Sequence, residues 1–167
     1  NDESFMKTSF YKQPHIIAAA IWLLMVITSG RLLTDIGPWY FSLKQPDWKP
    51  PDWAFGLIWT TIFLLASFSW NFAWQGSSTK KQKIIISCLF IANGLLNVFW
   101  SLLYFQWHRP DWSLIEAIFL WLSVFAIITF TWRFSKLAAL FISPYIIWVS
   151  LAILLNLETI RLNGPFQ

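Results

Sequence analysis

The sequence predicts an all-α integral membrane protein, a bundle of five transmembrane helices forming a single membrane domain over residues 1–167. Hydrophobic residues make up 57% of the chain and charged residues only 12%, about half the charged share of a soluble domain. Aromatic residues make up 20%, including 13 Trp and 16 Phe, more than one aqueous domain can bury without exposing large apolar patches. Long uncharged stretches also recur along the chain. These three observations exclude a soluble globular protein.

The charge balance and the cysteine content exclude further classes. Twelve Lys and Arg against eight Asp and Glu give a net charge of +4, which suits anionic lipid headgroups but is too sparse for a nucleic-acid-binding surface. The single cysteine, Cys88, cannot form an intrachain disulfide. Because it lies in an apolar run, we expect it to be a small buried hydrophobe.

The uncharged stretches set the number of spans, since about 20 apolar residues are needed to cross the hydrocarbon core. They cover residues 13–30, 53–79, 84–108, 117–132 and 137–157. The fourth is short, but Glu116 lies within a turn of its end and is expected to reach the headgroups, so the helix extends back to Trp112. The continuous apolar runs do not show the alternation of a membrane barrel.

The predicted helices cover about residues 14–33, 53–75, 83–107, 112–134 and 137–162. The first is interpreted as a retained span rather than a signal peptide, because its apolar stretch is long and the small-residue cleavage pattern is weak. The second and fourth begin at Pro-Asp-Trp triplets, in which proline suits the first turn, aspartate favours the helix dipole and tryptophan anchors at the interface. Pro144 is expected to bend the fifth helix.

Five spans place the two termini on opposite sides of the membrane. Seven cations fall on the side of the N-terminus and five on the other, which favours an N-terminus inside. The first group is Lys7, Lys12, Lys80, Lys81, Lys83, Arg133 and Lys136. The second group is Arg31, Lys44, Lys49, Arg109 and Arg161.

The one long connection, residues 34–52, is predicted to be a lid. A loop of this length in so small a bundle is usually functional. Its prolines restrict the unfolded chain, so ordering it over the bundle loses less entropy than its length suggests. The alternative is an amphipathic loop that lies at the membrane interface.

Three predicted helices carry aromatic and amide side chains at helical spacing. These are Trp59, Phe63, Ala66 and Trp70 on the second, Asn93, Asn97, Trp100 and Tyr104 on the third, and Tyr145, Trp148, Ala152 and Asn156 on the fifth. An unpaired amide near the membrane midplane has a large free-energy cost, so Asn93 and Asn97 must face other helices or a cavity. The pattern is typical either of a pocket for a flat apolar molecule or of a packed core with amides bonded between helices.

Residues in a fixed register resemble a known family. The most specific stretch is Trp39, Tyr40, Leu43, Pro46, Trp48, Pro50, Pro51, Trp53, Phe55, Gly56 and Trp59. It is followed by Asn93, Asn97, Trp100 and Ser101, and then by Pro144, Tyr145, Trp148, Ser150, Ala152, Asn156 and Arg161. With these residues the chain resembles the TspO or translocator protein family, also called tryptophan-rich sensory proteins and peripheral benzodiazepine receptors.

The resemblance implies a five-helix bundle, often a homodimer, whose pocket opens toward the first loop and accepts porphyrins, haem-type tetrapyrroles and other apolar ligands. It implies that Trp39 and Tyr40 belong to the lid. The cavity would be lined by Trp59, Asn93, Asn97, Trp100, Tyr145, Trp148 and Ala152, and Phe63 and Tyr104 on the same faces complete the candidate ligand-binding set. No cofactor or metal is required.

One departure from the family concerns sterols. Animal members carry an aliphatic residue, a tyrosine and a basic residue near the C-terminus. Here Leu157 stands at the tyrosine position, beside Glu158. This predicts against sterol transport and favours a prokaryotic cell membrane over a mitochondrial one.

Three functions remain open. The first is a protein that senses, stores or moves a tetrapyrrole, held by stacking on Trp59, Trp100 and Trp148. Its propionates would meet cations at the rim, for which the candidates are the second group above, Arg31, Lys44, Lys49, Arg109 and Arg161. The second is an enzyme that degrades porphyrin under light, for which the resemblance assigns the electron-rich indoles of Trp59 and Trp148. No pair of side chains suggests acid–base catalysis. His15 and His108 fall on opposite membrane faces, so they are not expected to bind one metal ion together. The third is an accessory subunit of a larger membrane complex.

Overall fold

The computed structural model describes residues 13–167 and confirms the all-helical membrane bundle. Within these residues five helices are long and apolar enough to cross a bilayer, so the chain is an integral membrane protein with five spans. They are α2 (Pro14–Leu33), α4 (Asp52–Gly76), α5 (Lys80–Ser101), α6 (Pro110–Thr131) and α7 (Lys136–Asn163). A π-helical turn, η1 (Leu102–Gln106), continues α5.

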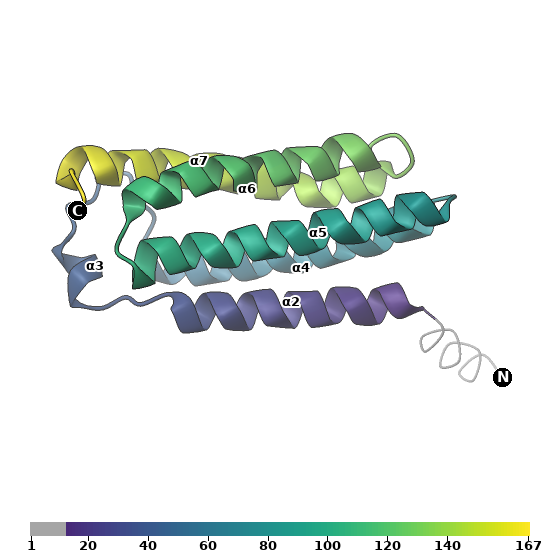
Figure 1. Cartoon of the computed structure of the whole chain (residues 1–167), viewed down its shortest axis with the longest axis horizontal. Coiled ribbons are helices and arrows are strands. Elements are labelled where there is room, and N and C mark those ends of the chain that lie inside the picture. The colour runs from purple at the N-terminus through teal and green to yellow at the C-terminus, as the bar shows by residue number, and fades with distance from the viewer. Residues whose placement is uncertain (1–12) are drawn as a thin grey trace.

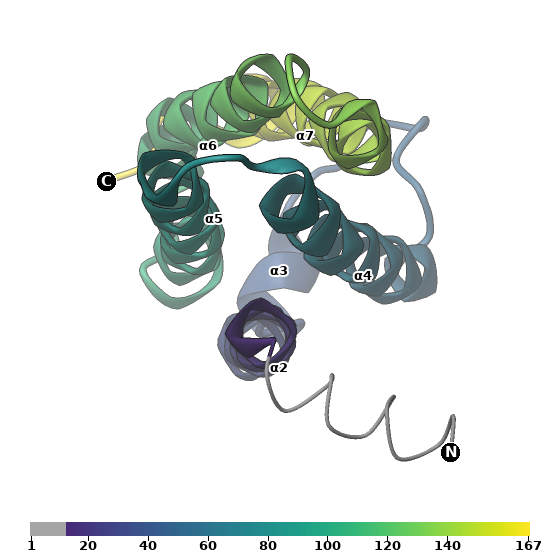
Figure 2. The same cartoon turned by 90° about the vertical axis from the view of Figure 1, so that its right-hand side faces the viewer.

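The helices form a closed ring (Figure 2). Helix α2 packs against α4 and α5, α5 packs against α6, α6 against α7, and α7 against α4. The connection between α2 and α4 and the end of α7 lie together at one end of the bundle (Figure 1). We call this end the lid end. The α4–α5 and α6–α7 connections lie at the opposite end, and Lys7 and Lys12, which the predicted orientation counts, are outside the described residues.

Local signals explain where the helices begin. The Thr79 side chain accepts a hydrogen bond from the Gln82 amide, so α5 begins at Lys80, earlier than the predicted residue 83. Pro110 occupies the first turn of α6, where a missing N–H is tolerated, and this helix begins two residues before the predicted start. The predicted starts are set by the ends of the uncharged stretches, and such stretches end at a polar first turn even though the helix continues through it.

The predicted lid loop is partly helical. A short helix, α3 (Pro38–Ser42), lies between two extended segments and covers the lid end of the bundle (Figure 1). In contact with α3, the η1 turn ends with a hydrogen bond from the Trp107 amide to the Leu102 carbonyl. His108 follows with a φ of 54°, in the left-handed region that few residues other than glycine adopt. The chain thereby reverses sharply into α6.

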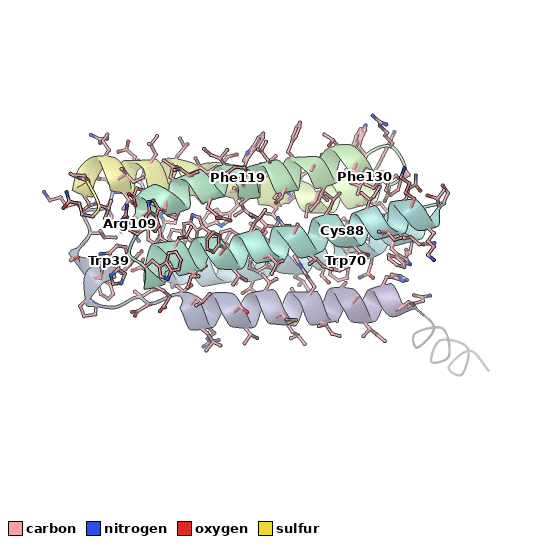
Figure 3. The ribbon with its side chains drawn as sticks, viewed as in Figure 1. Trp39, Trp70, Cys88, Arg109, Phe119 and Phe130 are labelled. Atoms are coloured by element: carbon pink, nitrogen blue, oxygen red, sulfur yellow. The ribbon has the colours of Figure 1, made fainter. Side chains whose placement is uncertain are left out.

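Two side chains lie where the sequence did not place them. Cys88 is exposed on the outer face of α5 instead of buried, because the apolar surroundings of this helix face are lipid and not protein (Figure 3). Glu116 does not reach the headgroups: it is 6% exposed and lies within the bundle. It occupies the same side of α6 as the buried residues Ser113 and Leu120, which face α5 and α7.

A buried polar node, centred on Asn156, ties three helices together at the lid end. Its Oδ1 accepts hydrogen bonds from Trp100 Nε1 (3.2 Å) and Ser113 Oγ (3.1 Å). Its Nδ2 donates to the Pro110 carbonyl at 2.8 Å. Because the alternative is an unpaired polar group in an apolar interior, this node holds α5, α6 and α7 in register.

Candidate functional site

A cavity of about 510 Å³ lies at the lid end of the bundle, a size typical of small-molecule sites. Its walls come from α2, α4, α5 with η1, α7 and the 34–52 connection. The residues that line it are Ile27, Gly30, Arg31, Thr34, Ile36, Tyr40, Gln45, Lys49, Asp52, Trp53, Phe55, Gly56, Trp59, Thr60, Phe63, Asn97, Trp100, Ser101, Tyr104, Phe105, Ala152, Leu155 and Asn156. Most of this surface is apolar or aromatic.

Two aromatic walls bound the cavity. On α4, Trp59 stacks on Phe63, one turn further along the helix, with ring centroids 5.3 Å apart. On the opposite wall, Trp100 stacks on Tyr104 at 5.0 Å. The bond from Trp100 Nε1 to the Asn156 node fixes the indole plane. Rigid rings on two sides favour a flat apolar ligand.

The lid supplies a charged cluster at the cavity mouth. Tyr40 donates a hydrogen bond to Asp52 Oδ1 at 2.7 Å, and Lys49 Nζ donates to the same oxygen at 2.7 Å. Burial, together with the bond to Asp52 and its negative charge, raises the pKa of the Tyr40 phenol well above its usual range. The phenol therefore stays a hydrogen-bond donor at every physiological pH and holds α3 to the start of α4.

A second set of contacts fastens the lid to other elements. The Lys44 amide donates to Asn163 Oδ1 at 2.7 Å, and Asn163 Nδ2 donates back to the Lys44 carbonyl at 2.8 Å. Trp39 stacks on His108 with centroids 4.2 Å apart and nearly parallel planes. Trp39 lies at the lid end in Figure 3. The lid is thus attached both to the end of α7 and to the η1–α6 turn.

We expect Asn163→Ala to loosen the lid. The substitution removes both hydrogen bonds to the Lys44 main chain, each contributing about 0.5–1.5 kcal/mol. The readout is hydrogen–deuterium exchange, which should become roughly tenfold faster or more for the Lys44 amide. Asn163→Asp is the matched control, since it keeps the acceptor for that amide and should exchange more slowly than Asn163→Ala. Unchanged exchange in Asn163→Ala would show that Trp39 and Tyr40 hold the lid without the Asn163 contact.

The cavity gathers residues from all three predicted faces and from the lid. Those on its wall are Tyr40, Trp59, Phe63, Asn97, Trp100, Tyr104 and Ala152. Tyr40 reaches the wall from the 34–52 connection. Asn97 donates through Nδ2 to the Tyr145 hydroxyl at 2.8 Å, so one amide hydrogen is already used.

Four candidate residues lie behind the wall or away from it. Trp39 packs on His108 and edge-on against Tyr104. Asn93 is fully buried, and its Nδ2 donates to Ser123 Oγ of α6 at 3.0 Å. Tyr145 supports the wall from behind, edge-on to Trp59.

Trp148 also lies behind the wall. It packs edge-on against Trp59, with ring centroids 6.1 Å apart, and contributes to a separate apolar groove between α4 and α7. Pro144 lines the same groove. Trp148 also packs against Phe55 of the wall, with ring centroids 5.6 Å apart, so it would act on a ligand in the cavity through Trp59 and Phe55.

Several wall residues were not among the candidates. Arg31 and Lys49 were expected only as rim cations, and Gln45 was not expected at all. The amide nitrogen Nε2 of Gln45 is buried and forms no hydrogen bond of good geometry within residues 13–167, and the side chain faces the Tyr104 hydroxyl. Helical spacing gives no signal for a residue in an irregular loop, so only the folded lid brings Gln45 to the cavity.

Comparison with known proteins identifies the family. The model of the TspO/MBR family matches residues 16–162. The chain is 36% identical over 128 residues to Protein CrtK of Rhodobacter capsulatus, covering 76% of this chain and 79% of that protein. It is 33% identical over 127 residues to Tryptophan-rich protein TspO of Chlorobaculum tepidum, covering 75% and 80%. It is 27% identical over 120 residues to human Translocator protein, covering 71% and 70%. The chain, with its five membrane spans and its lidded aromatic cavity, therefore belongs to the TspO/MBR family.

Proposed function

We propose that the cavity binds a flat, largely apolar molecule that carries carboxylates, with a porphyrin or related tetrapyrrole as the class that fits best. The observation that carries this proposal is the combination of two aromatic walls with a cationic mouth around one cavity. The protein would use this site to sense, store or move the pigment within the bilayer.

The aromatic walls account for the apolar, planar part of the ligand. Trp59 and Phe63 on one side and Trp100 and Tyr104 on the other offer ring faces and edges to a macrocycle. Stacked or edge-on aromatic contacts contribute about 0.5–1.5 kcal/mol each beyond the area they bury. A ligand that touches both walls would gain several such contacts.

The mouth accounts for the carboxylates. Arg31 lines the cavity and forms no ion pair within residues 13–167. Gln45 Nε2 is a buried donor on the same wall, beside the Tyr104 hydroxyl. A carboxylate placed there would satisfy the amide and pair with the guanidinium, which is a charge-assisted contact of the stronger kind.

Titration with protoporphyrin in lipid nanodiscs tests the proposal. We expect saturable quenching of tryptophan fluorescence and a shift of the porphyrin absorption. The dimethyl ester of the same porphyrin should bind at least about tenfold more weakly, because it lacks the charges that contribute roughly 1.5–3 kcal/mol per hydrogen bond. Quenching that grows linearly, as in empty nanodiscs, would contradict binding. Equal affinity of acid and ester would contradict the role of the mouth.

A second candidate function is light-dependent porphyrin turnover. The observation that favours it is the indole pair, in which Trp59 lies on the wall and Trp148 directly behind it. An excited macrocycle would take one electron from Trp59, and Trp148 would then reduce the oxidised Trp59. Turnover would require an external one-electron reductant to restore Trp148. Illumination of the complex should bleach the porphyrin, and Trp59→Phe should slow bleaching more than Trp148→Phe does. Bleaching at the rate of free porphyrin would leave binding alone as the function.

A further inference from the structure

Glu116 is a buried carboxyl group for which the proposed binding site has no use. It lies in the second turn of α6 and is 6% exposed. Both carboxyl oxygens are buried, and neither has a hydrogen-bond partner among residues 13–167. An ionised carboxylate in an apolar interior without a partner is very unfavourable, so a group in this position is stable only as the uncharged acid.

The lack of a hydrogen-bond partner distinguishes Glu116 from the other polar residues on the same face of α6. Ser113 donates to Asn156 of α7 at 3.1 Å. Ser123 accepts from Asn93 of α5 at 3.0 Å. The polar groups before and after Glu116 are therefore paired across the helix interfaces, whereas the one carboxyl between them is not.

Two polar side chains connect the surroundings of Glu116 with the cavity. Tyr145 of α7 interacts electrostatically with Glu116, and it also faces Asn93 and Asn97 of α5. Its hydroxyl accepts a hydrogen bond from Asn97 Nδ2, and Asn97 itself lines the cavity. Asn93 Oδ1 is a further buried acceptor that has no hydrogen-bond partner in the described part of the chain. The Tyr145 phenol thus lies directly behind the polar part of the wall and relates it to Glu116.

The other charged groups on the packed helices are already paired or distant. Near the start of α6, Asp111 pairs with Arg109 at 2.6 Å. In the last turns of α7, Glu158 pairs with Arg161 at 2.7 Å. The lysines of α5 are in its first turn, at the end opposite the lid. Tyr104 of η1, which also packs against α6, has Thr159 and Gln45 as its polar neighbours. Tyr145 is the titratable group that interacts with Glu116, and within the described part of the chain no ion pair compensates a charge there.

We propose that Glu116 is a proton-binding site whose occupancy is coupled to the binding of an anionic ligand in the adjacent cavity. In the resting protein at neutral pH the group carries its proton. Ionisation of Glu116 would place a negative charge behind Asn97 and repel the carboxylates of the ligand. The coupling rests on the proposed function, whereas the bound proton does not depend on it.

The sign of the coupling follows from linkage, which is reciprocal between the two ligands. The anionic ligand prefers the protein with protonated Glu116, so its binding strengthens proton binding by the same factor. Ligand affinity is therefore highest at the pH at which Glu116 is protonated and falls as rising pH removes that proton. Coupling of this kind usually amounts to roughly 5- to 150-fold.

Infrared spectroscopy in an ester-free detergent tests the proton directly. We expect a C=O stretch of a protonated carboxylic acid at neutral pH, lost at alkaline pH and absent from Glu116→Gln. The matched control is Glu158→Gln, which removes an exposed, ion-paired carboxyl and should keep the band. A wild-type spectrum without the band would overturn the proton site. So would a band that Glu116→Gln retains. The alkaline titration needs only the wild type, so the test survives if the variant fails to fold.

The pH dependence of protoporphyrin affinity tests the coupling. Protoporphyrin carboxylates are already ionised at neutral pH, so their own charge is constant over the range. The wild type and Glu158→Gln should lose affinity roughly 5- to 150-fold between neutral and alkaline pH, and Glu116→Gln should lose markedly less. Equal losses in all three would overturn the coupling. Absence of binding at every pH would overturn the proposed function and the coupling together, and the infrared band would still decide the proton site.

Discussion

Ala152→Phe is expected to lower the affinity for protoporphyrin at least tenfold, which corresponds to about 1.4 kcal/mol of binding free energy. Ala152 lies on the α7 part of the cavity wall, near Leu155 and Asn156. A phenyl ring at this position projects into space that the ligand needs. The walls on either side are fixed by ring stacking and by the Trp100–Asn156 bond, so they cannot retreat to make room.

Fluorescence titration of the purified variant measures the affinity, and its thermal unfolding shows whether the bundle is intact. Ala18→Phe makes the same chemical change on the exposed face of α2, far from the part of α2 that lines the cavity. This control should bind like the wild type. Equal affinity of Ala152→Phe and the wild type would mean that the ligand lies elsewhere.

Gly94→Ala is expected to destabilise the bundle by about 1–3 kcal/mol, the usual effect of overpacking a tight contact. At Gly94 the backbone of α5 approaches α2 closely. An added Cβ would lie 2.5 Å from Trp22 Nε1 and 3.0 Å from Val26 Cγ2. Trp22 cannot move away freely, because its Nε1 donates to the Phe90 carbonyl at 2.8 Å. The methyl group therefore forces the two helices apart or breaks this bond.

Unfolding in mixed detergent, followed by tryptophan fluorescence, measures the change. Gly30→Ala is the matched control, because a Cβ there meets nothing within 4 Å and the residue lies in helix α2. This variant should be as stable as the wild type or more stable by roughly 0.5–1 kcal/mol, since alanine loses less backbone entropy in a helix. Similar destabilisation of both variants would show that close helix approach at Gly94 is not the cause.

The membrane spans could be predicted because a single physical quantity, the length of an uncharged apolar run, decides them. The same simplicity explains the misplacement of Glu116. Counting charge treats a carboxyl near the end of an apolar run as a headgroup contact, whereas α6 turns this residue inward between α5 and α7. Only the rotation of the helix about its axis decides whether such a carboxyl reaches the headgroups or faces the bundle interior. In a helix that is hydrophobic on both its lipid-facing and its protein-facing side, the spacing of apolar residues does not reveal that rotation.

The aromatic faces could be predicted from spacing, but the depth of the cavity could not. Asn93 and Asn97 are one turn apart on α5, yet only Asn97 reaches the cavity, while Asn93 is directed to Ser123 of α6. In the same way Ala152 lies on the wall and Trp148, one turn away, lies behind Trp59. Helix spacing identifies a face, whereas the point at which neighbouring helices separate depends on how they pack.

The contact between Lys44 and Asn163 joins positions 119 residues apart in the chain. During translation, Lys44 is therefore synthesised long before Asn163, its partner in this contact. The contacts of Tyr40 with Asp52 and of Trp39 with His108 can form earlier, but this attachment can form only after the last turn of α7 has been synthesised and inserted. A product truncated just before Asn163 would possess every span and every aromatic wall, yet its lid would lack this attachment, so the final residues of α7 set the moment at which biosynthesis completes the closed site.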